Sequence, residues 1–301
     1  WRAVFVVPLV GGVVVAAAGV KLVQNVGERS NTTLDILSVV LLAAGITAFV
    51  YSVGEFSTNL IAGVVALFAA VVLLGLFAAR QLKLEHPVLN VRPMASVRFW
   101  PACLLVVVSM MTTFSMSVLL PLYFEGAYGM TALVAGLLIL PAIACNAVTS
   151  IVGGRVMDAR GAWPLLPVGF ALIAVGQTAI SMTAASMNIG VVVALTVVVY
   201  AGVGLVLSPS QTAGLETLPA AEHPHGTALL NTWNMIAASF GPSLFIGLLS
   251  SSAATAGAAG AATDVAQAIG FATAVRVAAV IAVVGFVASL VYARRESHMS
   301  H

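Results

Sequence analysis

The chain has 301 residues, of which 61% are hydrophobic and only 7% are charged, and its mean hydropathy is +1.10. So little polar surface excludes a soluble domain and indicates an all-α polytopic membrane protein. The formal net charge of +2 identifies no partner, because in a membrane protein the side on which each charge lies matters more than the sum. Cys103 and Cys145 lie in apolar segments, and we interpret them as small hydrophobic residues rather than as a disulfide or metal pair.

Nine segments are long and apolar enough to cross, as helices, a hydrocarbon layer roughly 30 Å thick. They span residues 4–23, 34–51, 60–79, 99–123, 133–152, 165–183, 189–208, 228–249 and 271–293. Because nine is odd, the two ends of the chain are expected on opposite sides of the membrane. The first residue is Trp1, and no charged region or cleavage site precedes the first apolar segment, so we expect a fragment that lacks its natural start.

Two connections between these segments are long. Residues 80–98 contain Pro87 and Pro93, which interrupt any helix, and their basic residues suit an anionic membrane surface, so they predict a cytoplasmic linker. Residues 250–268 consist almost wholly of Ala, Gly, Ser and Thr and predict a mobile external loop. The predicted regions are the last helix of a truncated N-terminal bundle (1–24), two accessory transmembrane helices with the linker (25–95), and a C-terminal six-helix bundle built as a three-plus-three inverted repeat (96–301).

Basic residues are distributed unevenly over this map. Most of them fall on one side of the membrane, which is therefore predicted to be cytoplasmic, with the C-terminus on that side. The residues on this side are Lys21, Arg29, Arg80, Lys83, Arg92, Arg98, Arg155, Arg160, Arg294 and Arg295, whereas Arg2 and Arg276 fall on the other.

The nonapeptide GGRVMDARG predicts a charged turn at a membrane face between two apolar segments. Its Gly154, Asp158 and Gly161, with Arg155 and Arg160 between them, resemble the signature loop of the major facilitator superfamily of transporters, G-x-L-A-D-R-x-G-R-K. The resemblance implies a gating loop. In this loop, Asp158 would accept hydrogen bonds from the amino end of the following helix or pair with one of the arginines. Either contact would form a latch that only one transport state keeps. The alternative is an ordinary surface turn.

Further segments are similar to the fourteen-helix drug:proton antiporter branch of this superfamily. They are WRAVFVVPLVGG, LDILSVVLLAAGITAFVYSVGE, EHPVLNVR, LPLYFEGAYGMTALVAGLLILPA and HPHGTALLNTWNMIAASFGP, and they would place the chain at helices six to fourteen. The resemblance implies an exporter of the bacterial cytoplasmic membrane, which exchanges a small amphipathic molecule for protons by rocking two bundles. It implies no cofactor, since the proton gradient is the energy source, and no nucleic-acid partner. The expected partners are the transported molecule, the lipid bilayer and the missing N-terminal bundle.

Several side chains on four segments are predicted to line a substrate cavity. Family position makes the helix of residues 99–123 a cavity wall, and polar residues in membrane helices usually face the bundle interior. The alternative is that hydroxyls bond their own helix, methionine fills a gap and amides join helices. The predicted residues are Ser109, Thr112 and Met116 on one helical face, Asn146, then Thr196 and Tyr200 on a face with Gly204, and finally Asn231 and Asn234.

Gly241 and Pro242, in SFGPSLFIG, resemble the antiporter motif G-P-x-x-G-G, which the family places in its fifth helix. Glu125 is expected at the outer mouth, where an acid attracts cations or takes a proton, unless it is a solvated surface acid. Arg276 is expected about one turn inside the last span, where it snorkels outward or pairs with Asp264 or Glu125.

Other function classes fit the sequence less well. A membrane-embedded enzyme would need clustered His, Asp or Glu residues or a nucleophile beside a base, and a channel would need a filter loop or rings of like charge. The sequence shows neither pattern, so we expect no catalytic or metal site. An importer or facilitator of the same superfamily shares nearly every feature and remains the main alternative. No acidic residue lies in the middle of a predicted span, so the proton-coupling carboxylate is expected outside this chain.

Overall fold

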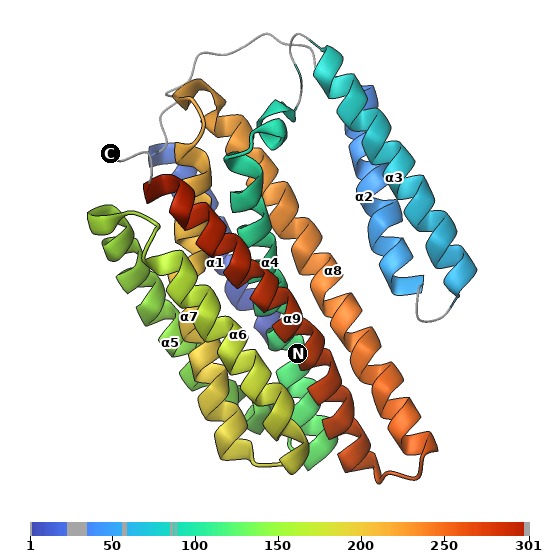
Figure 1. Ribbon diagram of the computed structural model, residues 1–301. Helices are drawn as coiled ribbons and strands as arrows, with labels where there is room; N and C mark the ends of the chain where they lie inside the picture. Colours follow the sequence, from blue (N-terminus) through green and yellow to red (C-terminus); the bar gives the residue numbers. More distant parts are fainter. Residues whose placement is uncertain (1, 23–34, 56–58, 85–86, 88, 298–301) are drawn as a thin grey trace. The chain divides into compact units, whose positions relative to one another are not determined.

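The computed structural model describes residues 2–22, 35–55, 59–84, 87 and 89–297, and every regular element within them is a helix (Figure 1). The chain divides into two compact units, Trp1–Leu34 and Asp35–His301. The first unit contains α1 (Arg2–Leu22), which coincides with the first predicted segment. Its shorter apolar part runs over Pro8–Gly19.

The second unit contains the remaining elements. Eight of its helices are long and apolar enough to cross a membrane, which confirms the multi-pass, all-α class. These helices are α2 (Ile36–Glu55), α3 (Leu60–Lys83), α4 (Phe99–Tyr128), α5 (Ala132–Arg160), α6 (Leu165–Thr183), α7 (Ile189–Glu216), α8 (His223–Ala258) and α9 (Thr263–Ser297), with short 3-10 helices η1 (Arg92–Ala95), η2 (Ala184–Ser186) and η3 (Ala220–Glu222) between them.

Helices α4 to α9 form a bundle around α4, which contacts α7, α8 and α9. Helix α7 packs between α5 and α6, and α6 also packs against α9. In a membrane such contacts depend on close packing, because lipid tails are as apolar as the helices. Gly202 shows how this is achieved, since a methyl group added there would lie 2.5 Å from the carbonyl oxygen of Gly169 on α6.

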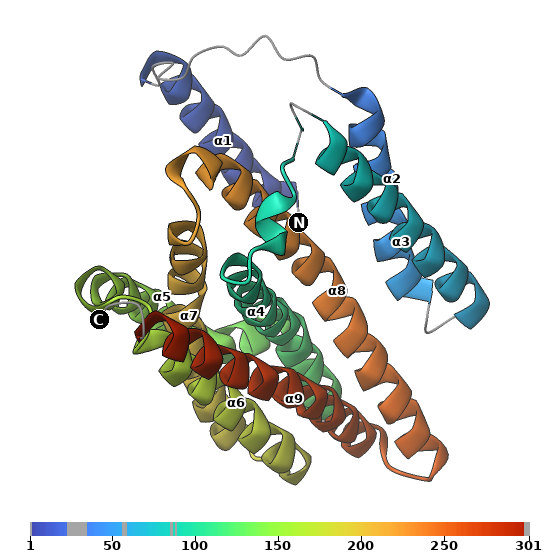
Figure 2. The same cartoon turned by 45° about the horizontal axis from the view of Figure 1, so that its top comes forward.

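Helices α2 and α3 form an antiparallel hairpin (Figure 2). The hairpin contacts the bundle because α2 packs against α8. The rings of Phe49 on α2 and Phe240 on α8 are stacked, with centroids 5.8 Å apart. A second hydrophobic core joins the end of the hairpin to the linker, the start of α4 and the α7–α8 connection. It includes Phe77, Leu89, Phe99, Leu218 and Leu229, all of them buried. The hairpin is therefore attached to the bundle at two places, the stacked rings and the second hydrophobic core.

The structure corrects two predicted connections. Residues 250–268 are not a loop, since α8 continues to Ala258 and α9 begins at Thr263. Alanine has the highest helix propensity of all residues, so an Ala-rich segment extends both helices. The charged nonapeptide is not a turn either, because α5 includes Arg160. The helix ends only at Gly161, which has a φ of 75° and donates from its N–H to the carbonyl oxygen of Met157 at 2.8 Å.

The ends of α3 and α5 and the start of α4, which carry most of the described basic residues, lie at the same end of the second unit (Figure 1). This matches the predicted charge asymmetry, while the cytoplasmic assignment of that end stays a prediction. Arg29 lies outside the described residues, as do the side chains of Arg2, Lys21, Arg294 and Arg295.

Candidate functional site

The predicted cavity face on α4 is buried within the second unit. Ser109, Thr112 and Met116 share one side of this helix, as predicted, and at most 3% of each residue is exposed. The Ser109 hydroxyl donates to the carbonyl oxygen of Leu105 in the same helix at 2.9 Å, and Met116 belongs to the hydrophobic core. In this arrangement the face serves helix packing, and its contact with a transported molecule stays a prediction.

Helices α5 and α7 are joined by an amide and by a close backbone approach. Asn146 on α5 donates from Nδ2 to the carbonyl oxygen of Tyr200 on α7 at 3.1 Å. A methyl group added at Gly204 would lie 2.6 Å from the carbonyl oxygen of Asn146. Thr196 is buried, and its hydroxyl donates to the carbonyl oxygen of Val192 at 2.8 Å. These contacts match the structural alternative, in which amides join helices and hydroxyls bond their own backbone.

The two predicted amides of α8 lie in different surroundings. Asn231 is exposed, whereas Asn234 is buried and its Oδ1 has no hydrogen-bond donor among the described residues. Gly241 brings α4 and α8 together, because a methyl group added there would lie 3.2 Å from the Cα of Met111. Pro242 removes a backbone donor from the middle of the same helix. The motif-like pair therefore shapes the α4–α8 contact, and its role in antiport stays a prediction.

The predicted gating residues lie mainly in the last turns of α5. Gly154, Arg155, Asp158 and Arg160 are part of the helix, and Gly161 ends it. The three charged side chains are exposed. Within the part of the chain that the structure describes, Asp158 pairs with neither arginine and does not cap α6. A latch would therefore need a partner that this arrangement does not supply, and the gating role stays a prediction.

Glu125 and Arg276 lie toward the opposite end of the unit from the gating residues. Glu125 occupies the last turn of α4 and is exposed. Arg276 is also exposed, but it lies deeper than predicted. Because α9 begins at Thr263, this arginine is about 3.6 turns into the helix rather than one. Among the described residues it forms no ion pair with Glu125 or Asp264.

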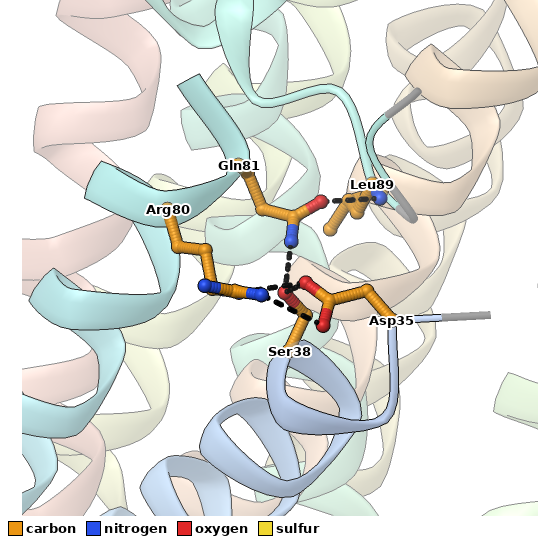
Figure 3. A network of polar contacts seen from close by, with 5 residues as sticks. All are labelled: Asp35, Ser38, Arg80, Gln81 and Leu89. Carbon is orange, nitrogen blue, oxygen red and sulfur yellow. Dashed lines mark hydrogen bonds and ion pairs between the residues drawn. The ribbon is translucent and has the colours of Figure 1, made fainter. Parts of the chain in front are cut away.

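A polar network ties α2, α3 and the linker together at one end of the hairpin (Figure 3). Arg80 donates from Nε and Nη2 to the two carboxylate oxygens of Asp35, at 2.7 and 3.1 Å. The Ser38 hydroxyl donates to the same carboxylate at 2.6 Å. Gln81 donates from Nε2 to Ser38 Oγ at 2.6 Å, and its Oε1 accepts from the backbone N–H of Leu89 at 3.0 Å. The network therefore fixes both the hairpin and the start of the linker.

The hydrogen bonds from Arg80 and Ser38 lower the pKa of Asp35 from 3.8 to about 2, against a smaller effect of desolvation. The carboxylate is thus ionised at every physiological pH. The Asp35 side chain is 17% exposed and that of Arg80 is 39% exposed, so water and salt weaken the pair. The network is best understood as a geometric constraint on the hairpin.

Sequence reasoning missed this network, since it counted Arg80 only among the basic residues of one membrane face and gave Asp35 no role. A usable signal was present. Asp35 lies at the start of one predicted span and Arg80 follows the end of the next, so an antiparallel hairpin brings them to the same end. Gln81 carried no signal, because nothing in the sequence shows that the linker returns to α3.

Comparisons with known proteins identify the family. The profile of the Major Facilitator Superfamily matches residues 1–242. The lincomycin resistance protein LmrB of Listeria monocytogenes is 30% identical over 83% of this chain and 54% of its own length, and that of Bacillus subtilis is 30% identical over 83% and 53%. The uncharacterized MFS-type transporter YcnB of Bacillus subtilis is 32% identical over 96% of this chain and 61% of its own length.

The chain thus spans between about half and three fifths of the length of these relatives. The drug-resistance names of the two LmrB proteins fit the resemblance of this chain's segments to the fourteen-helix branch. The family match covers well over half of the chain, and the described helices have the length and composition of membrane spans. The chain therefore belongs to the Major Facilitator Superfamily of membrane transporters and is not an enzyme.

Proposed function

We propose that this chain is the C-terminal portion of a proton-coupled exporter of small amphipathic molecules, including drugs, in a bacterial cytoplasmic membrane. The observation that carries this proposal is the similarity, over most of the chain, to relatives named for lincomycin resistance. The similarity of its segments to the fourteen-helix drug:proton antiporter branch supports proton exchange as the source of energy. The C-terminus would then lie in the cytoplasm, on the side with most of the basic residues.

The exposed faces of α5 and α8 leave room for a partner bundle supplied by the intact protein, although α2 and α3 of the hairpin are buried just as little. Only 17% of the most apolar part of α5 and 22% of that of α8 is buried, compared with 61% for α4. The exposed side chains include Leu137, Leu140 and Ile143 on α5, and Asn231 and Met235 on α8. Rocking of a preceding bundle against these faces would open a path for the substrate alternately to the two sides.

Drug susceptibility of cells that produce the intact protein tests this proposal. We expect a raised minimal inhibitory concentration of lincomycin or of a cationic dye such as ethidium, and lower dye accumulation than in cells with the empty vector. A protonophore should abolish the difference in accumulation, because export would lose its energy source. Equal accumulation in both strains, with the protein present in the membrane, would contradict export. Higher dye accumulation in the producing cells would favour an importer or facilitator.

A further inference from the structure

A cavity of about 430 Å³ lies where α4 begins and where α7 and α9 end. Its volume falls within the range of small-molecule sites, roughly 300 to 1,000 Å³. Its position differs from that of every residue set that the sequence predicts to bind substrate, because those residues lie deeper in the bundle or on other helices. The transport proposal leaves this cavity without a role.

The wall of the cavity is mainly apolar. Trp100 and Leu104 line it from α4, Ala213 from α7, and Ala288 from α9. The two alanines are small, so α7 and α9 leave space beside α4. The Tyr292 hydroxyl also reaches this wall, and it donates to the carbonyl oxygen of Ala213 at 3.1 Å. An occupant of this space would therefore need an apolar part.

Two charges of opposite sign lie on the lining of the cavity. Arg98 immediately precedes α4, and Glu216 is the last residue of α7. Both residues are exposed, and both line the cavity. Within the described residues, neither side chain takes part in an ion pair, so the two do not neutralise each other. The lining of the cavity thus carries one cationic and one anionic group that are not paired with each other.

We propose that this cavity binds a phospholipid with a zwitterionic ethanolamine headgroup. The lipid phosphate would accept hydrogen bonds from Arg98, and its primary ammonium would donate to Glu216. One acyl chain would extend along Leu104, which lies roughly 9 Å deeper than Arg98 along the helix. This inference goes beyond the proposed function, because it concerns a lipid that is bound and not transported.

The position of the cavity favours a membrane lipid as the occupant. It lies at the ends of membrane-spanning helices, where headgroups meet water, and Trp100 is 46% exposed there, as is typical of interfacial tryptophans. Val97 and Val291, beside it on the lining, are also exposed. An anionic glycerol headgroup would leave Glu216 without a cation. A choline headgroup has no N–H to donate, so phosphatidylethanolamine fits best.

Native mass spectrometry of the intact protein in detergent tests the inference with three lipids of equal chain length, phosphatidylethanolamine, phosphatidylcholine and phosphatidylglycerol. We expect the wild type to bind phosphatidylethanolamine about tenfold more tightly than the other two lipids. The reason is that neither of them can make the charge-assisted hydrogen bond to Glu216. Glu216→Gln should abolish this preference while phosphatidylglycerol binding is kept or increased, because Arg98 remains. Arg98→Gln with Glu216→Gln should weaken the binding of all three lipids.

The matched control is Lys83→Gln with Glu222→Gln, which makes the same change in charge outside the cavity lining. It should keep the wild-type preference. Equal binding of the three lipids by the wild type would overturn the inference, and so would an unchanged preference in folded, monodisperse Glu216→Gln protein. Because no transport is measured, these outcomes are independent of whether the protein exports drugs.

Discussion

Gln81 connects three parts of the molecule with one buried amide. It is 2% exposed, and its two polar atoms bond Ser38 on α2 and the backbone of Leu89 in the linker. Gln81→Ala should lower the free energy of unfolding by about 1 to 3 kcal/mol, because buried polar groups are left without a partner. Unfolding of the purified intact protein in detergent measures this loss.

The control for that substitution is Gln211→Ala on α7. Gln211 is half-buried, and its side chain has no hydrogen bond to another described residue, so its removal should change stability little. Equal losses in the two variants would show that the network adds nothing specific to the hairpin.

Asp35 makes the network sensitive to pH only in acid. Its folded pKa of about 2 is lower than the ordinary 3.8, so its stabilising effect is complete above about pH 5 and decreases as the pH falls below 4. The difference in thermal midpoint between the wild type and Asp35→Asn should therefore be constant from pH 5 to 8 and shrink toward pH 3. A difference that grows toward pH 3 would exclude a paired carboxylate.

Asp158 is exposed and unpaired among the described residues, so its predicted latch must act in another state of the intact protein. Asp158→Asn should reduce efflux severalfold without lowering the amount of protein in the membrane, because only the charge is lost. Dye efflux from preloaded cells measures the effect. The matched control is Asp264→Asn, at the start of α9. If Asp158→Asn cells export dye at the wild-type rate, α5 merely ends in a solvated charged turn of helix.

At the scale of helices, the sequence predicted the eight membrane segments of the second unit correctly. The reason is that the thickness of the bilayer sets the length of apolar sequence that a spanning helix needs. It was less reliable at their ends. Residues 250–268 consist almost wholly of Ala, Gly, Ser and Thr and were interpreted as a loop, although alanine continues a helix as well as leucine does. Conversely, Arg155 and Asp158 suggested a turn, whereas the residue that ends α5 is Gly161, with its positive φ.

The side-chain environment could be predicted only in part. The i, i+3, i+7 spacing of Ser109, Thr112 and Met116 correctly placed them on one helical face. Spacing cannot show what covers that face, and here it is the rest of the same bundle. The contacts of Asn146 with α7 and of Gln81 with the linker also depend on tertiary neighbours, which one sequence does not specify.

The accessory hairpin should move together with α8. Stacking of Phe49 on Phe240 and the second hydrophobic core attach it to the bundle at two separate places. Phe49→Cys with Phe240→Cys, in a background where Cys103 and Cys145 are replaced by alanine, should therefore tolerate a short thiol cross-linker without loss of efflux. Efflux that stops on cross-linking, while the uncross-linked variant transports, would show that α2 and α8 move apart during the cycle.

At the scale of the whole molecule, the described bundle buries α4 and leaves α5 and α8 largely uncovered. In the proposed exporter these two helices face the preceding bundle, so alternating access is a movement of one rigid body against another. Within the described bundle, α4 to α9, no acidic residue is buried. Coupling to protons is therefore expected to depend on a carboxylate elsewhere in the intact protein.

Proton movement in everted membrane vesicles tests the central claim most directly. Vesicles from cells that produce the intact protein are energised until their lumen is acidic, and a pH-sensitive dye reports the gradient. Addition of lincomycin or ethidium should partly collapse the gradient, because each molecule that enters the vesicle would exchange for protons, and vesicles without the protein should show no change. Entry of the compound into the protein-containing vesicles without any change in the gradient would contradict proton-coupled export and show a facilitator instead.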